Sequence, residues 1–158
     1  MSRTRFISRL GAVLLAAALL APCLGAIPAQ AAVGTRIYTV EDLWGIGNDP
    51  GGTYTLMNDL DLSGWNGGWW MPIEFSGTFY GGGHTISGLR VRDDFSAGLF
   101  GLMHGTCTVT DLTVRLEAME NAGFGGILAA EYVADEPGDS LTLRNCTAVG
   151  NVTVHGRE

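Results

Sequence analysis

Three tryptophans stand close together in the glycine-rich segment Gly64–Trp70, and they are the residues of this chain best suited to holding a ligand. Exposed indole rings form flat apolar platforms on which the C–H faces of sugars stack, while polar groups at the edge supply hydrogen bonds. We therefore predict that Trp65 and Trp69 are ligand-binding residues, with a glycan as the first candidate ligand.

Two acids, Asp59 and Asp61, form the best pair of carboxylates because residues two apart on a strand project from the same face. Exposed carboxylates at this spacing suit calcium binding, or paired-carboxylate chemistry on a sugar chain. We favour the alternative that Leu60 and Leu62 face the core while the carboxylates face water or accept hydrogen bonds from turn amides.

Other catalytic patterns are missing from the sequence. His84, His104 and His155 are isolated, with no His-Glu-x-x-His pair and no cysteine–histidine spacing typical of zinc, and no serine lies in a Gly-x-Ser-x-Gly elbow. We expect His84 to have a structural role between a turn and a strand. The sequence thus predicts no catalytic residue, no metal site and no cofactor.

The first 32 residues have the pattern of a signal peptide. Arginines at 3, 5 and 9 precede the apolar run Leu10–Leu24, and Ala29-Gln-Ala31 supplies a signal-peptidase site. Removal of residues 1–32 leaves 126 residues with six arginines, no lysine and sixteen acids, a formal charge of −10. This charge argues against nucleic acid and anionic membranes as partners. We expect a secreted or cell-surface protein without membrane insertion after signal removal.

Elements that would position the tryptophans are indicated by a repeat. Four segments share an apolar frame that continues with alternation of period two, which is typical of strands with one buried face: Tyr54–Leu62, Thr85–Val91, Thr108–Val114 and Thr142–Ala148. Glycine makes up 22 of the 126 residues, so turns are frequent. Repeats of this length predict stacked all-β units covering residues 51–158.

Superposition of the segments sets an expected register. Ile86 would lie over Val109 and Val109 over Leu143, at steps of 23 and 34 residues, and Met57 would match Ile86 at a step of 29. The acidic, turn-rich stretch Asp135–Ser140 would then be an insertion at a corner, where a stack of strands tolerates extra residues.

An N-terminal cap is predicted over residues 33–50. Thr39 precedes acidic residues and an apolar face, which favours a short helix over Val40–Ile46. A stack of repeats needs its open end covered, and we expect the ring of Trp44 to fill the first unit.

The order and spacing of the apolar and glycine motifs resemble those of the GLUG-motif repeats of bacterial surface proteins. The matching segments are Tyr38–Leu43, Tyr54–Leu62, Trp70–Ile73, Phe75–Phe79, Gly83–Leu89 and Gly98–Gly101. The resemblance covers about residues 38–154. It implies a right-handed parallel β-helix of the pectate-lyase-like class, here of about three to four coils, and packing of Trp70 beneath a turn. Two departures stand out, at Tyr80–Ile86 and at Gly125–Leu128.

The expected register also bears on the cysteines. Cys107 lies two residues before Val109 and Cys146 three residues after Leu143, so their positions differ by five strand residues, or about 16 Å. A disulfide needs Cα atoms within about 7 Å. We therefore predict free thiols, with Cys146 as a small buried apolar residue.

These observations together favour a non-catalytic surface module of the adhesin type that binds an extracellular glycan or a host or matrix protein. One alternative is a polysaccharide lyase or hydrolase, but enzymes of that class use a basic residue beside the acids, and no lysine or arginine lies within twenty residues of Asp61. The other is the N-terminal fragment of a larger surface metallopeptidase. The last repeat reaches Val154 without a closing cap, so we expect an incomplete chain, or self-association through this end.

Overall fold

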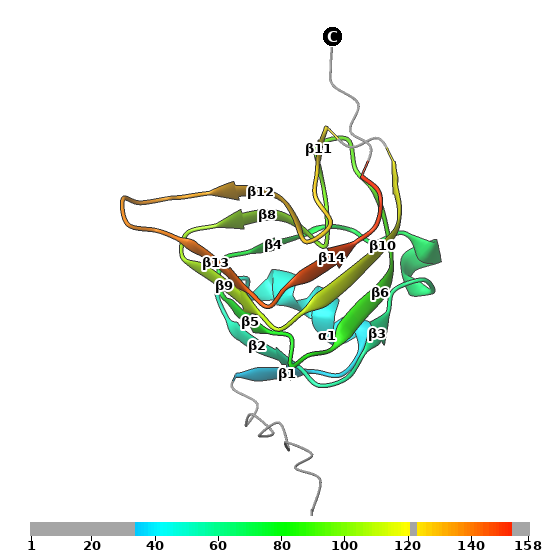
Figure 1. The fold of residues 1–158 in the computed structure, drawn as a ribbon, viewed down its shortest axis with the longest axis horizontal. Coiled ribbons are helices and arrows are strands. Elements are labelled where there is room, and N and C mark those ends of the chain that lie inside the picture. The colour runs from blue at the N-terminus through cyan, green and yellow to red at the C-terminus, as the bar shows by residue number, and fades with distance from the viewer. Residues whose placement is uncertain (1–33, 121–122, 153–158) are drawn as a thin grey trace, which may run out of the picture.

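The computed structural model describes residues 34–120 and 123–152, and Figure 1 shows their arrangement. The predicted signal peptide, His155 and the expected uncapped end after Val154 lie outside the described residues. The described part is mostly β-strand with one short α-helix, as expected for an all-β protein. No helix within it is both long and apolar enough to cross a membrane.

The described residues form four sheets, and every strand pairing among them is parallel. The first contains, in order, β1 (Thr35–Ile37), β2 (Thr53–Leu56), β5 (Thr78–Tyr80), β9 (Cys107–Thr110) and β13 (Leu141–Arg144). The second contains β3 (Leu60–Asp61), β6 (Thr85–Arg92), β10 (Thr113–Glu120) and β14 (Thr147–Val149). The third contains β4 (Ile73–Phe75), β8 (Phe100–His104) and β12 (Ala129–Val133), and the fourth β7 (Ser96–Ala97) and β11 (Phe124–Gly125).

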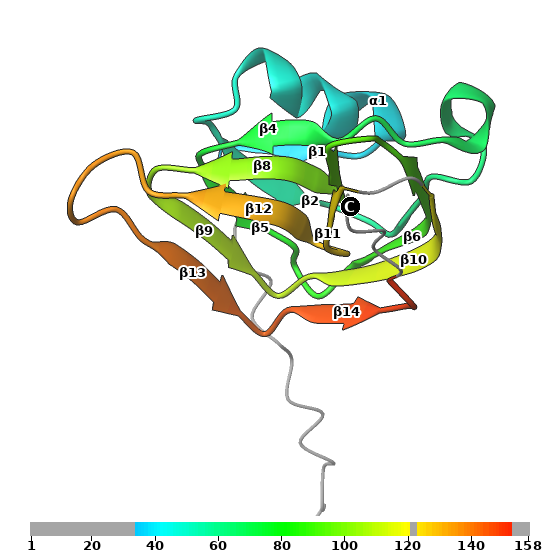
Figure 2. The same ribbon diagram turned by 90° about the horizontal axis from the view of Figure 1, so that it is seen from above.

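Spatial neighbours within each sheet come from successive stretches of the chain. The chain passes through the first, second, fourth and third sheets as β5, β6, β7 and β8, and then repeats this order as β9, β10, β11 and β12. Figure 2 shows the arrangement of the sheets from above. Buried apolar side chains from these sheets form one core cluster. Phe75 and Phe100 stack there with ring centroids 4.7 Å apart, and Phe79 meets both rings edge-on.

The strand register confirms one expected superposition and shows that two were wrong. Val109 pairs with Leu143, as expected, but Ile86 pairs with Leu60 and Val114 rather than with Met57 and Val109. The reason is that one pass of the chain contains two similar alternating strands joined by a short turn. The superposition placed β6 on β9, a strand of another sheet, because β5 is only three residues long and its pattern is weak.

Left-handed residues form the turn between the paired strands. Asp111 between β9 and β10 has φ of 55°, and Asn145 at the equivalent position between β13 and β14 has φ of 52°. The Asn145 side-chain amide donates to Asp111 Oδ1 at 2.8 Å, so the two turns are tied together. The equivalent turn between β5 and β6 is formed by glycines, and the Gly83 N–H donates to the Asp111 carbonyl at 2.7 Å.

A short helix forms near the expected place, but the expected role of Trp44 was wrong. Helix α1 (Val40–Trp44) begins at a capping box in which Thr39 and Asp42 exchange side-chain-to-backbone hydrogen bonds, and the 3₁₀ turn η1 (Gly45–Asn48) follows. Leu43 and Ile46 are fully buried, whereas Trp44 is 41% exposed. A helix of one turn presents a single narrow face to the core, so the residue next to Leu43 points away from it.

Both described cysteines are free, as predicted. Cys107 is buried, and its thiol lies 3.0 Å from the His104 carbonyl. Cys146 is only partly buried, since it lies between β13 and β14, which are the end strands of their sheets among the described residues.

Candidate functional site

The tryptophan loop is built on η2 (Trp65–Gly68), which follows β3. Asn66, Gly67 and Gly68 have φ values of 45°, 71° and 87°, so three successive residues are left-handed, and glycine at two of them keeps the strain small. Trp70 fixes the end of the loop. Its ring is buried, its Nε1–H donates to the Leu99 carbonyl at 2.9 Å, and its backbone N–H donates to the Arg90 carbonyl at 2.7 Å. The expected packing of Trp70 is thereby confirmed.

Trp65 lines an apolar hollow on the surface of the molecule. Its indole packs against that of Trp44, with ring centroids 6.2 Å apart and planes inclined at 43°. Asn66 and Met71 complete the lining, and the hollow has a volume of about 400 Å³. Met71 is 52% exposed and Trp44 is 41% exposed, whereas Trp65 is only partly exposed.

Trp69 lies in a different environment, although it is only four residues further along the loop. The guanidinium groups of Arg90 and Arg92, both on β6, lie 4.8 and 4.6 Å from the centroid of its ring. Trp70 forms a parallel bridge with Val91, and this bridge sets Trp69 beside the two arginines. Cation–π contacts of this kind are worth about 0.5–1 kcal/mol at exposed positions.

The structure places the predicted residues in two neighbouring features rather than one. Trp65 belongs to the hollow and Trp69 to the arginine pair. Sequence reasoning missed Trp44, Asn66 and Met71. A signal for Trp44 was available, since two adjacent large apolar residues cannot both face the core from a single helical turn.

The carboxylates of Asp59 and Asp61 bond turn amides, as in the alternative that we favoured. Asp59 Oδ1 accepts from the Thr85 N–H at 2.8 Å and lies 3.3 Å from His84 Nδ1, while Asp61 Oδ1 accepts from the Ser63 N–H at 2.9 Å. Backbone N–H groups are the main reason that the pKa values of both aspartates are lowered. Leu60 and Leu62 between and after them are buried.

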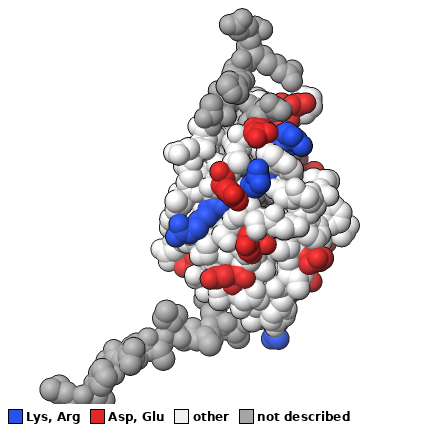
Figure 3. Space-filling model, turned by 90° about the vertical axis from the view of Figure 1, so that its right-hand side faces the viewer, with Lys and Arg blue, Asp and Glu red and all other residues white. Residues whose placement is uncertain are grey.

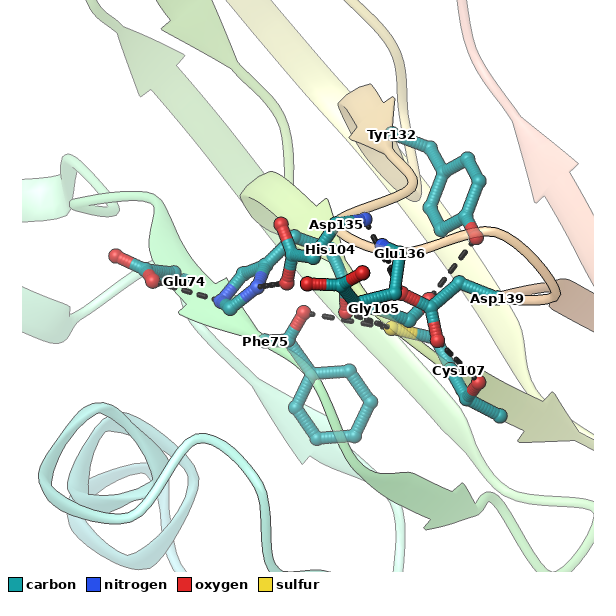
Figure 4. A network of polar contacts seen from close by, with 10 residues as sticks. Glu74, Phe75, His104, Gly105, Cys107, Tyr132, Asp135, Glu136 and Asp139 are labelled. Atoms are coloured by element: carbon teal, nitrogen blue, oxygen red, sulfur yellow. Dashed lines mark hydrogen bonds and ion pairs between the residues drawn. The ribbon is translucent and has the colours of Figure 1, made fainter.

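His104 on β8 lies between the carboxylates of Glu74 and Asp135, as Figure 4 shows. Its Nε2 is 2.8 Å from Glu74 on β4, and its Nδ1 is 2.7 Å from Asp135 beyond β12. The hydrogen bond to Asp135 is the largest cause of a raised pKa at His104, and Glu74 adds to it. Sequence reasoning missed this cluster because it forms only when β4, β8 and β12 lie side by side.

The acidic corner beyond β12 is further held by Asp139. Its side chain accepts from Thr106 Oγ1 at 2.8 Å and from the N–H groups of Glu136 and Asp135 at 2.8 and 3.1 Å. These contacts give His104 and its acids a structural role at the corner. Across residues 34–120 and 123–152, no group of three or more histidines, cysteines and acids has an arrangement that could hold a metal ion.

Comparison with known proteins gives one distant relative. The chain is similar to part of Halomucin from Haloquadratum walsbyi, with 34% identity over 140 residues, covering 77% of this chain and 1% of Halomucin. The chain thus spans about a hundredth of the length of that protein. No known protein-family model and no solved structure matches the chain.

Proposed function

We propose that this protein is a non-catalytic, extracellular binding module in which a parallel β-helix presents the hollow of Trp44, Trp65, Asn66 and Met71 to a glycan. The observation behind this proposal is that the exposed Trp44 and the partly exposed Trp65 pack together and line that hollow. Two inclined indoles offer apolar faces to a sugar ring, and the Asn66 amide supplies both a hydrogen-bond donor and an acceptor beside them.

The recurring order of the strands supports the β-helix. Neighbouring strands of the three larger sheets come from successive passes of the chain and pair in parallel, at steps that include 25, 26 and 34 residues. Stacked passes of this kind are what the resemblance to GLUG-motif repeats implies, and we propose that the chain is a member of that group. Parallel crossovers are right-handed in about 98% of cases, so we assign that hand.

An extracellular location is supported by the signal-peptide pattern of residues 1–32 and by the acidic, lysine-free composition of the rest. Similarity to Halomucin, whose name denotes a mucin-type protein, agrees with it. That similarity also favours a second proposal, that the module is one segment of a longer surface protein.

The contacts of the titratable side chains support binding rather than catalysis. Asp59 and Asp61 accept hydrogen bonds from different turns, and both ring nitrogens of His104 face carboxylates. A general acid or base acts through a position open to the substrate, and in these groups both nitrogens of His104 and one oxygen of each aspartate already interact within the fold.

A glycan array probed with the exported protein tests the proposal. The wild type should retain a defined set of glycans, and Trp65→Ala should lose about tenfold in affinity for them, which corresponds to about 1.4 kcal/mol. Phe124→Ala removes an exposed aromatic ring on β11, away from the hollow, and is the control, expected to match the wild type. Equal retention by Trp65→Ala would contradict the proposal.

A further inference from the structure

The cluster of Trp69, Arg90 and Arg92 combines an aromatic ring with two cations in a chain that is strongly acidic. The two arginines are two residues apart on β6, so they project from the same face of the strand. Both guanidinium groups lie within 5 Å of the centroid of the Trp69 ring. Figure 3 shows the side of the molecule where η2 and β6 lie, with basic side chains gathered among acidic ones.

These two arginines have no carboxylate partner in the described part of the chain. The ion pairs within 4.0 Å that form there belong to His84 and His104. Arg90 Nε is enclosed and, among the described residues, finds no hydrogen-bond partner. Glu120, which pairs with Arg92 across β10 and β6, is the acid that the strand register brings opposite the cluster. The cluster therefore holds positive charge that the fold does not neutralise by contact.

From this geometry we infer that the Trp69–Arg90–Arg92 cluster binds an anionic substituent, a carboxylate or a sulfate, of a glycan held at the neighbouring hollow. The inference rests on the proposed function, because it names the class of glycan that the loop selects. A guanidinium that lies over an indole ring can still offer N–H edges to a ligand. Those edges match the oxygens of a carboxylate or sulfate with two parallel hydrogen bonds.

Affinity electrophoresis in gels that contain dextran, carboxymethyl-dextran or dextran sulfate tests the inference, since the three polymers share one sugar backbone. The wild-type exported protein should be retarded about tenfold more strongly by at least one of the two anionic polymers than by dextran. The difference should shrink as salt is added, because the contact is between partly exposed charges. Which polymer retards more separates carboxylate from sulfate recognition.

Variants connect this retention to the cluster. Arg92→Gln should lose about tenfold in retention by the preferred anionic polymer, whereas Arg36→Gln, the same charge change on β1 in another sheet, should match the wild type. Glu120→Gln should strengthen anionic retention severalfold by removing the opposing charge. Arg92→Lys keeps the positive charge but lacks the planar guanidinium. Its retention by the anionic polymer should therefore lie between that of Arg92→Gln and that of the wild type.

Equal retardation of the wild type by the three polymers would overturn the inference, as would equal losses in Arg92→Gln and Arg36→Gln. A different result would contradict the proposed function, namely that Trp65→Ala retains every glycan as well as the wild type does. A protein that binds neutral glycans through Trp65 and shows no anionic preference therefore refutes only the inference.

Discussion

Trp65 packs its indole against that of Trp44 at a centroid distance of 6.2 Å, although the two residues belong to separate elements, the loop after β3 and the N-terminal helix. The contact joins the cap of the molecule to the loop that carries the other two tryptophans. Trp44 itself lies outside the core. Leu43 and Ile46 fill the interior from the cap, so Trp44 is available to form one wall of the hollow.

Cysteine reactivity should differ sharply between the two described thiols. Cys107 is buried, and burial is the largest cause of its raised pKa, whereas Cys146 is partly exposed. Only the thiolate reacts readily, so we expect Cys146 to be modified first in the native, unreduced protein and Cys107 only after denaturation. Titration with a thiol reagent followed by mass spectrometry of the peptides checks this order. Finding the two residues in a disulfide would contradict the register of β9 and β13.

Gly77 should be intolerant of alanine because the strands approach closely there. A Cβ at this position would lie 2.1 Å from the Gly52 carbonyl oxygen, and backbone atoms cannot move away without disturbing the pairing of β2 and β5. We expect Gly77→Ala to destabilise the protein by roughly 1–3 kcal/mol, measured by urea unfolding. At Gly45 a Cβ would meet nothing within 4 Å, so Gly45→Ala is the control. Equal stability of both variants would mean that the two backbones are further apart.

Stability should depend on pH through His104. Its folded pKa is raised above the unfolded value of 6.5, chiefly by the hydrogen bond to Asp135, so the protonated form is favoured in the folded state. The resulting stabilisation is fully present below the unfolded pKa and is lost as the pH rises through the folded pKa. The melting temperature of the wild type should therefore fall between about pH 6 and about pH 9 more than that of His104→Gln. Parallel pH profiles of the two proteins would show that His104 is not held by its acids.

The sequence predicted those features that depend on local signals. The capping residues Thr39 and Asp42 lie three apart and act within one turn, so their role could be predicted without a structure. The pairing of Val109 with Leu143 was also recoverable, because both strands are followed by the same turn with Asp111 or Asn145 in a left-handed conformation.

The candidate site is formed by contacts between residues far apart in the sequence, which local sequence patterns do not predict. Trp69 meets Arg90 and Arg92 only through the bridge between Trp70 and Val91, which joins residues 21 positions apart. His104 meets Asp135 across 31 residues in the same way. Such pairs are set by the stacking register, and the register was wrong for Ile86 because two strands in each pass of the chain share one pattern.

The proposed function places the glycan in the hollow between Trp44 and Trp65. Isothermal titration calorimetry with the oligosaccharide that the array retains most strongly, on the wild type and on Trp44→Ala, measures how much this hollow contributes to binding. Trp44 lies outside the core, so its loss should leave the melting temperature within about 3 °C of the wild type while weakening binding about tenfold. Unchanged affinity for the oligosaccharide in a folded Trp44→Ala protein would contradict this placement of the glycan.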